Sequence, residues 1–216
     1  MKTAPASLLT CLLIGYLLGS FSPSFLLGRL KGYDIRKSGS GNAGASNVVI
    51  LLGKMAGLLV ILLDILKAAS SWWICQALFP SFPVAGVLGG VAAVLGHIYP
   101  IWLRFHGGKG LSCLGGVILA HDPKALLLML GLALLIGIAT NYICIVTVAM
   151  SVIWPVYYWM DTGSVLGAVL LSVPVIPIFC KHLVNFRRIR CGKELRLSFL
   201  WKKNQELERI GYIDEL

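Results

Sequence analysis

The chain is dominated by apolar stretches that are long enough to cross a lipid bilayer. A spanning helix needs about 20 mostly apolar residues, and turn-forming residues separate seven such stretches, one of them short. Charged residues are only 13% of the chain and mean hydropathy is +0.84, so too few polar side chains exist to cover a water-facing surface. We therefore predict one all-α polytopic membrane domain over residues 1–216, with about seven transmembrane helices. The expected spans are 7–28, 55–79, 84–105, 110–121, 124–139, 140–160 and 163–182, followed by a cytoplasmic tail at 183–216.

Basic residues gather beside these apolar stretches. The net charge is +10, and 16 of the 19 Lys and Arg lie in loop 29–54, in loop 104–110 or after residue 180. Alternating the seven spans places these three segments on one side, and Lys and Arg accumulate on the cytoplasmic side of membrane proteins. The pattern predicts a multi-pass protein of the cell (inner) membrane with its N-terminus outside and its C-terminus cytoplasmic. The same pattern explains the positive net charge without any binding of nucleic acid. The tail after the last span is expected to be interfacial or solvated.

The first loop carries a segment rich in glycine, serine and asparagine directly after two cations. Glycines let backbone N–H groups converge on an anion, Ser and Asn add neutral donors, and a helix beginning near residue 47 would add its positive dipole end. This composition favours phosphate binding, although a flexible linker between helices is the simpler alternative. The candidate ligands here are Arg36, Lys37, Ser38, Gly39, Ser40, Gly41, Asn42, Ser46 and Asn47.

A second glycine-rich segment, Gly107-Gly108-Lys109-Gly110, opens the short fourth span. It lacks the full P-loop pattern, so the sequence does not support nucleoside triphosphate binding. Glycine-flanked N–H groups, a helix N-terminus and one ammonium still suit a phosphate. The alternative is an ordinary tight turn whose lysine reaches the interface.

A third polar cluster lies where the last span ends. His182, Asn185 and Arg188 follow helical spacing and share a face, with Glu194 shortly after them. An imidazole, an amide and a guanidinium on one face predict a polar pocket. An anchor for lipid headgroups would explain the cations here, but not the histidine, the asparagine and the glutamate.

Inside the second span, Asp64 and Lys67 stand three residues apart, and His97 lies in the third. Intramembrane charges usually face a polar cavity or each other. A structural ion pair and a packed His97 are the simpler interpretation. The sequence has no His-x4-Asp pair and no Gly-x-Ser-x-Gly motif, and the basic side has too few acids to hold Mg²⁺ by carboxylates. We therefore expect a cationic pocket for one or two phosphates, with no metal and no cofactor.

Several of these motifs resemble the bacterial acyl-phosphate:glycerol-3-phosphate acyltransferases, the PlsY family. The resemblance runs in order over about residues 12–195 and includes Phe105-His106-Gly107-Gly108-Lys109-Gly110. The other similar segments are 19–20, 28–47, 52–54, 63–67, 96–100 and 181–194.

This resemblance implies seven spans, a cytoplasmic active site and an enzyme of phospholipid synthesis. The reaction moves a fatty acyl group from acyl phosphate to the first hydroxyl of glycerol 3-phosphate, giving lysophosphatidate and phosphate. Both substrates and membrane lipid are the implied partners, and no protein partner can be read from the sequence. The residues that would carry the chemistry are Ser40, Lys109, His182 and Asn185. Asn42, Ser46 and Thr147 would assist in substrate binding, together with the other polar groups named above.

The sequence departs from the family pattern at Ile50, where the family has an arginine. Losing the hydrogen bonds of one charged side chain would weaken phosphate binding by about 10- to 100-fold. Ile50→Arg is expected to raise activity if the missing cation is the defect. Two alternatives stay open: a catalytically impaired homologue with a lipid-binding or regulatory role, and an organic-anion or phosphate transporter.

Overall fold

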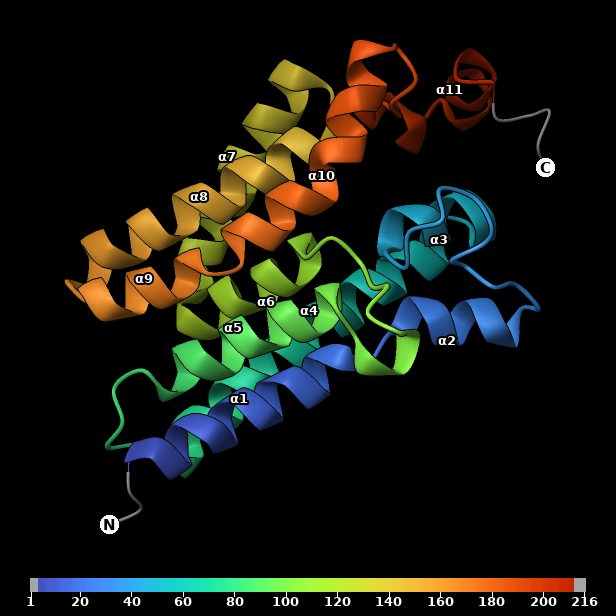
Figure 1. The fold of residues 1–216 in the computed structure, drawn as a ribbon. Coiled ribbons are helices and arrows are strands. Elements are labelled where there is room, and N and C mark those ends of the chain that lie inside the picture. Colours follow the sequence, from blue (N-terminus) through green and yellow to red (C-terminus); the bar gives the residue numbers. More distant parts are fainter. Residues whose placement is uncertain (1–3, 212–216) are drawn as a thin grey trace.

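The computed structural model describes residues 4–211, and the described chain is helical with no strand (Figure 1). The all-α polytopic prediction is therefore confirmed. Short turns join most of the helices, and two short 3-10 helices, η1 and η2, lie in the connections. The elements are α1 (Ala4–Ser20), α2 (Pro23–Leu30), α3 (Ala45–Leu52), α4 (Lys54–Leu78), α5 (Ala85–Ile98), η1 (Ile101–Leu103), α6 (Leu111–His121), α7 (Pro123–Thr140), α8 (Ile143–Thr162), α9 (Val165–Ser172), α10 (Val175–Arg190), η2 (Leu197–Leu200) and α11 (Lys203–Arg209).

Six helical segments of the described chain are long and apolar enough to cross a membrane, one fewer than expected. The segment 110–121 forms α6, whose 11 residues rise only about 16 Å, roughly half the hydrocarbon thickness of a bilayer. Helix α6 is therefore a short helix packed between the others. The six spans are Pro5–Leu30, Lys54–Leu78, Ala85–Leu103, Pro123–Thr140, Ile143–Thr162 and Val165–Arg190.

The first and last spans are each broken in two. Ser22 caps α2 by accepting a hydrogen bond from the Phe25 N–H, and Pro23 occupies the first helical position. The last span bends at Pro174, between α9 and α10. Loop 29–54, in which the sequence placed only a helix start near residue 47, contains the eight-residue helix α3.

The break at Ser22 explains the charged residues inside the membrane. In a continuous helix the carbonyl of Phe21 would accept from the Phe25 N–H, but Ser22 has taken that donor. Lys67 Nζ donates to the Phe21 carbonyl instead at 2.6 Å and lies 2.7 Å from Asp64 Oδ1. His97 Nδ1 lies 3.1 Å from the same ammonium. The expected Asp64–Lys67 ion pair is confirmed, and Lys67 satisfies a backbone group that lipid could not hydrate. Asp64 and His97 also line the polar cavity described below, so His97 is not only a packed residue.

Small residues bring α1 and α5 into close contact. A Cβ built on Gly15 would lie 2.2 Å from the Gly89 carbonyl oxygen, and one on Gly19 would lie 2.1 Å from that of Ala93. Close backbone approach of this kind stabilises helix pairs in lipid, where the hydrophobic effect between helices is absent.

Gly19→Ala is expected to destabilise the protein by about 1–3 kcal/mol, because the obstructing atom is backbone and one helix must shift. Gly131→Ala is the matched control: nothing lies within 4 Å of its Cβ position, so the higher helix propensity of alanine should stabilise by about 0.5–1 kcal/mol. Thermal unfolding in detergent measures both. Equal unfolding temperatures would contradict the importance of this contact.

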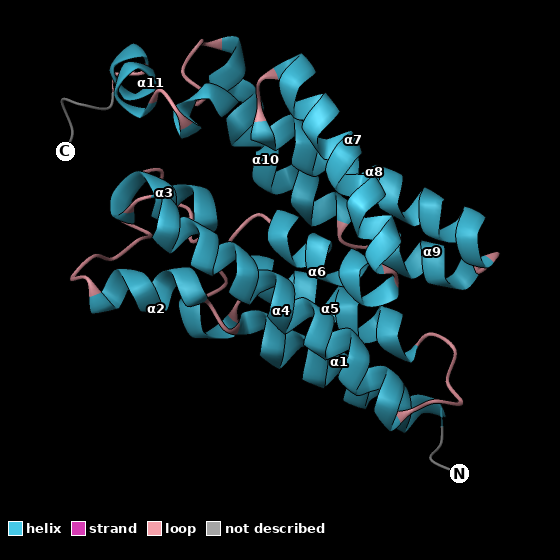
Figure 2. Ribbon diagram, turned by 180° about the vertical axis from the view of Figure 1, so that it is seen from behind, coloured by secondary structure: helices cyan, strands magenta, loops and turns pink. Residues whose placement is uncertain are grey.

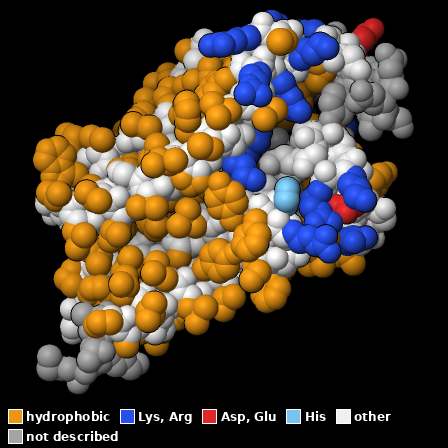
Figure 3. Space-filling model, viewed as in Figure 1, with side chains coloured by type: hydrophobic (Ala, Val, Ile, Leu, Met, Phe, Trp, Pro, Cys, Tyr) orange, Lys and Arg blue, Asp and Glu red, His pale blue; other side chains and the backbone are white. Residues whose placement is uncertain are grey.

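The polar segments gather at one end of the molecule. Figures 1 and 2 both place α2, α3, the end of α10 and α11 together, opposite the start of α1. On the face shown in Figure 3, Lys and Arg side chains concentrate at that end, and hydrophobic side chains cover most of the remainder. This arrangement agrees with the predicted common side for loop 29–54, loop 104–110 and the tail.

Candidate active site

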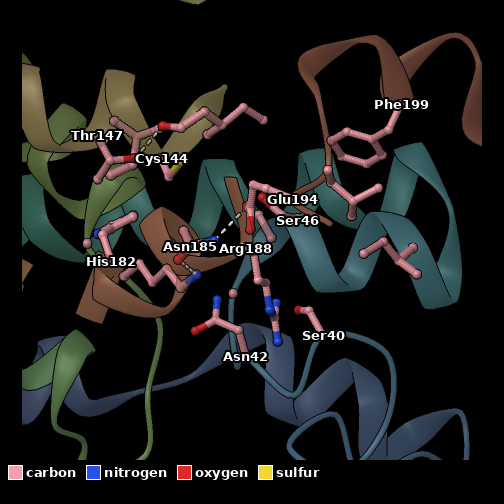
Figure 4. Close-up of a pocket in the computed structure, with 18 of the residues that line it drawn as sticks. Ser40, Asn42, Ser46, Cys144, Thr147, His182, Asn185, Arg188, Glu194 and Phe199 are labelled. Carbon is pink, nitrogen blue, oxygen red and sulfur yellow. Dashed lines mark hydrogen bonds between the residues drawn. The ribbon is translucent and has the colours of Figure 1, made fainter. Parts of the chain in front are cut away.

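A cavity of about 430 Å³ opens at the polar end, between α3, the start of α6 and the end of α10 (Figure 4). It joins all three polar segments that the sequence singled out. Residues expected to bind substrate that line it are Ser40, Asn42, Ser46, Lys109, Gly110, Thr147, His182, Asn185, Arg188 and Glu194.

The buried side chain of Asn47 shapes the first glycine-rich loop. Its Oδ1 accepts from the Ser40 N–H at 2.8 Å, and its Nδ2 donates to the Ile35 and Ser38 carbonyls at 2.8 and 3.0 Å. Gly39 has a φ of +62°, and a Cβ there would lie 2.2 Å from Asn47 Oδ1, so only glycine fits. Asn47 is thus a structural residue that holds Ser40 at the cavity.

The second glycine-rich segment packs tightly against the end of α5. The Gly107 and Gly108 N–H groups donate to the Ile98 and His97 carbonyls. A Cβ on Gly107 would lie 2.0 Å from the His97 carbonyl oxygen, and one on Gly108 would lie 2.2 Å from His97 Nε2. Neither glycine lines the cavity, and both are needed so that Lys109 emerges at its wall.

Lys109, Asn185 and Glu194 form a chain of charge and hydrogen bonds across the cavity. Lys109 Nζ donates to Asn185 Oδ1 at 2.5 Å, and Asn185 Nδ2 donates to Glu194 Oε1 at 2.6 Å. Burial lowers the pKa of Lys109 and raises the pKa of Glu194. Glu194 Oε2 is buried and has no hydrogen-bond partner among the described residues. A buried ammonium beside an oriented amide is suited to binding an anion.

His182 is buried on the same helix face, with its Nδ1 2.8 Å from the Ile178 carbonyl oxygen. Because a carbonyl only accepts, Nδ1 must carry the hydrogen, and a neutral ring then has its lone pair on Nε2. His182 therefore offers the cavity an acceptor for a hydroxyl proton. Thr147 of α8 also lines the cavity, and its Oγ1 donates to the Ile143 carbonyl at 2.9 Å.

Arg188 provides a second cation. Its side chain extends from α10 toward Ser40 and Asn42 in Figure 4, and it forms no side-chain hydrogen bond or ion pair within residues 4–211. Its guanidinium is thus free to bind a ligand in the cavity that Lys109 also lines.

The tail folds back over the cavity, contrary to the expectation of an interfacial or solvated segment. We call residues 195–209 the C-terminal strap. Phe199, 3% exposed, clusters with Val49 and Ile50 of α3, and Lys203 Nζ donates to the Ile50 carbonyl at 2.7 Å. Ile50 therefore both lines the cavity and packs against the strap.

The strap has two further attachments. The Leu197 N–H donates to the Asn141 carbonyl at 2.7 Å, in the turn between α7 and α8. Arg209 donates to the Gly192 and Glu194 carbonyls at 2.5 and 2.6 Å and pairs with Glu206 at 2.8 Å. Sequence reasoning missed this element, and its one local signal was the apolar run 197–200.

Some candidates from the sequence lie outside the cavity lining. Ser38 and Gly39 shape the loop beside Asn47, and Gly107 and Gly108 pack on α5. The cationic candidates Arg36 and Lys37, with Gly41, line a separate hollow on the outer side of the loop. The loop therefore has two faces.

One group of potential metal ligands lies deeper. Side-chain atoms of Asp64, His97 and Cys113 lie within 4.8 Å of one another. Lys67 Nζ, 2.7 Å from the Asp64 carboxylate, already supplies a fixed positive charge there. These residues fit an internal ion pair better than a metal site.

Comparison with known proteins places most of the chain in one family. The family model described as "Glycerol-3-phosphate acyltransferase" matches residues 9–192. The glycerol-3-phosphate acyltransferase of Symbiobacterium thermophilum is 34% identical over 193 residues, covering 89% of this chain and 96% of that protein. That of Allorhizobium ampelinum is 37% identical over 195 residues, covering 89% and 93%. The whole strap lies beyond the residues that the family model matches.

Solved structures agree with the sequence comparison. The crystal structure of PlsY (YgiH), an integral membrane glycerol 3-phosphate acyltransferase, in its glycerol 3-phosphate form superposes with a TM-score of 0.82. It is 32% identical, and the match covers 90% of this chain and 97% of that one. The lysophosphatidic acid form of that protein superposes with a TM-score of 0.78 at the same identity, covering 88% and 95%.

Proposed function

The chain belongs to the glycerol-3-phosphate acyltransferase family and is a membrane acyltransferase of phospholipid synthesis; we propose that its cavity transfers the acyl group of an acyl phosphate to glycerol 3-phosphate. The products are lysophosphatidate and phosphate. The observation that carries the proposal is the convergence of Lys109, Arg188, His182 and Asn185 with Ser40 in one cavity at the polar end. We place that end in the cytoplasm, because basic residues dominate it.

The chemistry needs no enzyme nucleophile. Acyl phosphate is a mixed anhydride with a good leaving group, so the glycerol hydroxyl oxygen can attack the acyl carbon directly. The new C–O bond forms first and gives a tetrahedral oxyanion, which collapses to the ester as the bond to the phosphate oxygen breaks. The hydroxyl proton ends on the released phosphate. Catalysis then depends on holding two anions together and stabilising the tetrahedral oxyanion.

The cavity residues divide naturally between these tasks. Lys109 and Arg188 supply the charge for the two phosphoryl groups, while Ser40, Asn42 and Ser46 supply neutral donors. His182 Nε2 is placed to accept a hydrogen bond from the attacking hydroxyl. In this assignment Arg188 provides the guanidinium that position 50 lacks.

The strap supports transfer by keeping water out. Acyl phosphate reacts with water as well as with an alcohol, so a covered cavity favours the bound glycerol hydroxyl. Phe199 closes the α3 side, and Leu195 lines the cavity beside it.

Phe199→Ala is expected to lower kcat/KM for glycerol 3-phosphate about tenfold and to raise the ratio of hydrolysis to transfer. The ratio of free fatty acid to lysophosphatidate measures this partition. Trp201→Ala is the matched control, since Trp201 is 64% exposed on the same strap, and it should keep both values. An unchanged partition in folded Phe199→Ala would rule out a water-excluding role.

The lowered pKa of Lys109 gives the enzyme a pH signature. Only the protonated ammonium binds phosphate, so kcat/KM, which reports the free enzyme, should fall with rising pH before an ordinary lysine would lose its proton. Lys109→Arg keeps its charge to about pH 12 and should remove this alkaline fall. A fall that persists in Lys109→Arg would assign the titration to another group.

The direct test of the function uses purified full-length protein, palmitoyl phosphate and labelled glycerol 3-phosphate, without CoA or added metal. Labelled lysophosphatidate with release of one phosphate supports the proposal. Well-folded protein that forms none would favour the impaired-homologue alternative. Uptake of labelled glycerol 3-phosphate into sealed vesicles, without acylation, would favour a transporter.

A further inference from the structure

A second cationic hollow lies on the outer side of the substrate loop. It has a volume of about 680 Å³ and is bordered by α2, the loop after it and the turn that follows η1. We call it the basic groove; its four basic residues are Arg29, Arg36, Lys37 and Arg104. Ser40 and Asn42 line the catalytic cavity, whereas Gly41 lines the groove. The two sites therefore share a loop but not its residues.

Aromatic contacts and an ion pair hold two of the guanidinium groups in place. The Arg29 and Arg36 Cζ atoms lie 5.3 and 5.0 Å from the centroid of the Phe25 ring. Asp34 accepts from Arg36 Nε and Nη2 at 3.0 and 2.9 Å, and these hydrogen bonds lower the pKa of Asp34 to about 2. Both carboxylate oxygens of Asp34 thus accept hydrogen bonds from the Arg36 side chain.

The other three cations of the groove lack an acidic partner. Arg29, Lys37 and Arg104 form no salt bridge with any residue between 4 and 211. Arg104 is held by a turn in which it and Phe105 have φ values of +52° and +63°. This backbone conformation is maintained by two hydrogen bonds: the Arg104 N–H donates to the Ile101 carbonyl, and the Phe105 N–H donates to the Pro100 carbonyl. The groove therefore presents about three positive charges that no acidic side chain in residues 4–211 compensates by a salt bridge.

The surroundings of the groove belong to a membrane interface. Trp102 lines it and is 69% exposed, and Leu30 and Phe105, which follow the lining residues Arg29 and Arg104 in the chain, are 72% and 55% exposed. Exposed aromatic and aliphatic side chains beside cations match the boundary between headgroups and acyl chains. A free phosphate would use the cations but not this apolar border.

We propose that the basic groove binds the phosphoryl headgroup of an anionic phospholipid, at a site separate from the catalytic cavity. Arg29, Arg36, Lys37 and Arg104 contact the phosphate, and the acyl chains pass along Trp102 and Leu30 into the bilayer. The proposal is independent of the transfer chemistry, because no residue that lines the groove also lines the catalytic cavity.

The test measures lipid binding to the detergent-solubilised full-length protein by native mass spectrometry. The probe is phosphatidylglycerol, a phosphodiester that is neither substrate nor product, against phosphatidylcholine with the same chains. Removing two interfacial cations in Arg29→Gln/Arg104→Gln is expected to weaken phosphatidylglycerol binding about 10- to 30-fold. Arg190→Gln/Lys202→Gln changes the net charge equally, at exposed positions of the same end outside the groove, and should bind as the parent does.

Three outcomes would overturn the proposal. Equal losses in the two double variants would show that net charge alone attracts the lipid. Displacement of phosphatidylglycerol by glycerol 3-phosphate would place the lipid in the catalytic cavity or reveal a site for free phosphates. Equal binding of phosphatidylcholine would remove the role of headgroup charge.

A second measurement needs no change at the cations. Trp102 emission is obtained as the difference between the parent and Trp102→Phe. Brominated phosphatidylglycerol should quench this emission more strongly than brominated phosphatidylcholine, because the groove holds the anionic lipid beside Trp102. Equal quenching by the two lipids would contradict the assignment.

Discussion

Lys109→Met is expected to abolish most of the acyl transfer, with kcat/KM lower by about 10²- to 10³-fold. Methionine keeps the length and apolar stem of the side chain but removes the ammonium that donates to Asn185 Oδ1 at 2.5 Å. A buried positive charge is worth more to a bound phosphoryl group than an exposed one, because water screens it less. The loss should fall on both substrates, since both carry phosphate.

Lys181→Met provides the control for Lys109→Met. Lys181 lies on α10, one residue before His182, but its Nζ sits 5.1 Å from the centroid of the Tyr99 ring and it does not line the cavity. The variant changes the net charge equally and should retain activity. A loss below about tenfold in Lys109→Met, the size expected for one ordinary hydrogen bond, would show that Lys109 is not the principal phosphate cation.

Six of the seven expected spans could be predicted, because length and hydropathy largely decide which segments cross a bilayer; the segment 110–121 is apolar but forms a helix too short to cross. The breaks within spans could not, because Ser22-Pro23 and Pro174 sit inside apolar sequence that continues on both sides. Proline at the first position of a helix continues a hydropathy pattern while ending the preceding helix. The break leaves the Phe21 carbonyl without a helical donor, and Lys67 Nζ donates to it instead. This hydrogen bond joins residues that are 46 positions apart in the sequence.

The cavity could be predicted from residue types and topology together. Ser40, Lys109 and Asn185 are polar residues beside different apolar segments. Alternating the seven predicted segments, including the short helix α6, brings these residues to one side. The sequence could not predict which loop residues face the cavity and which face outward. This depends on the left-handed backbone conformations of Gly39 and Gly41. For this reason the sequence grouped Arg36 and Lys37 with the substrate ligands, whereas the structure places them in the basic groove.

The strap could not be predicted because its contacts are long-range. Lys203 and Ile50 are 153 residues apart, and no local pattern in the tail predicts the hydrogen bond between them. The same contact changes the interpretation of Ile50. The resemblance drawn from the sequence predicted a phosphate site that lacks an arginine at this position, whereas in the structure Ile50 is 5% exposed and clusters with Val49 and Phe199.

Ile50→Arg is therefore expected to lower transfer by about tenfold or more, opposite to the result that a missing cation alone would give. Ile50 packs against Val49 and Phe199 and also lines the cavity, and a guanidinium is costly to bury beside those apolar side chains. We therefore expect the arginine to displace Phe199 and open the cavity to water. Hydrolysis of acyl phosphate should rise relative to lysophosphatidate formation. The measurement is the partition ratio together with kcat/KM for glycerol 3-phosphate.

Ile50→Leu controls for the change of shape, and it should keep near-parental activity because volume and polarity are conserved. Ile50→Arg/Phe199→Ala separates the two explanations of position 50. If position 50 carries isoleucine because this side chain packs against the strap, the double variant should be no more active than Phe199→Ala alone. Phe199→Ala has then already removed the side chain that covers the cavity. Activity above the parent in Ile50→Arg would instead show that the guanidinium reaches the substrate phosphate, and that Arg188 does not replace it.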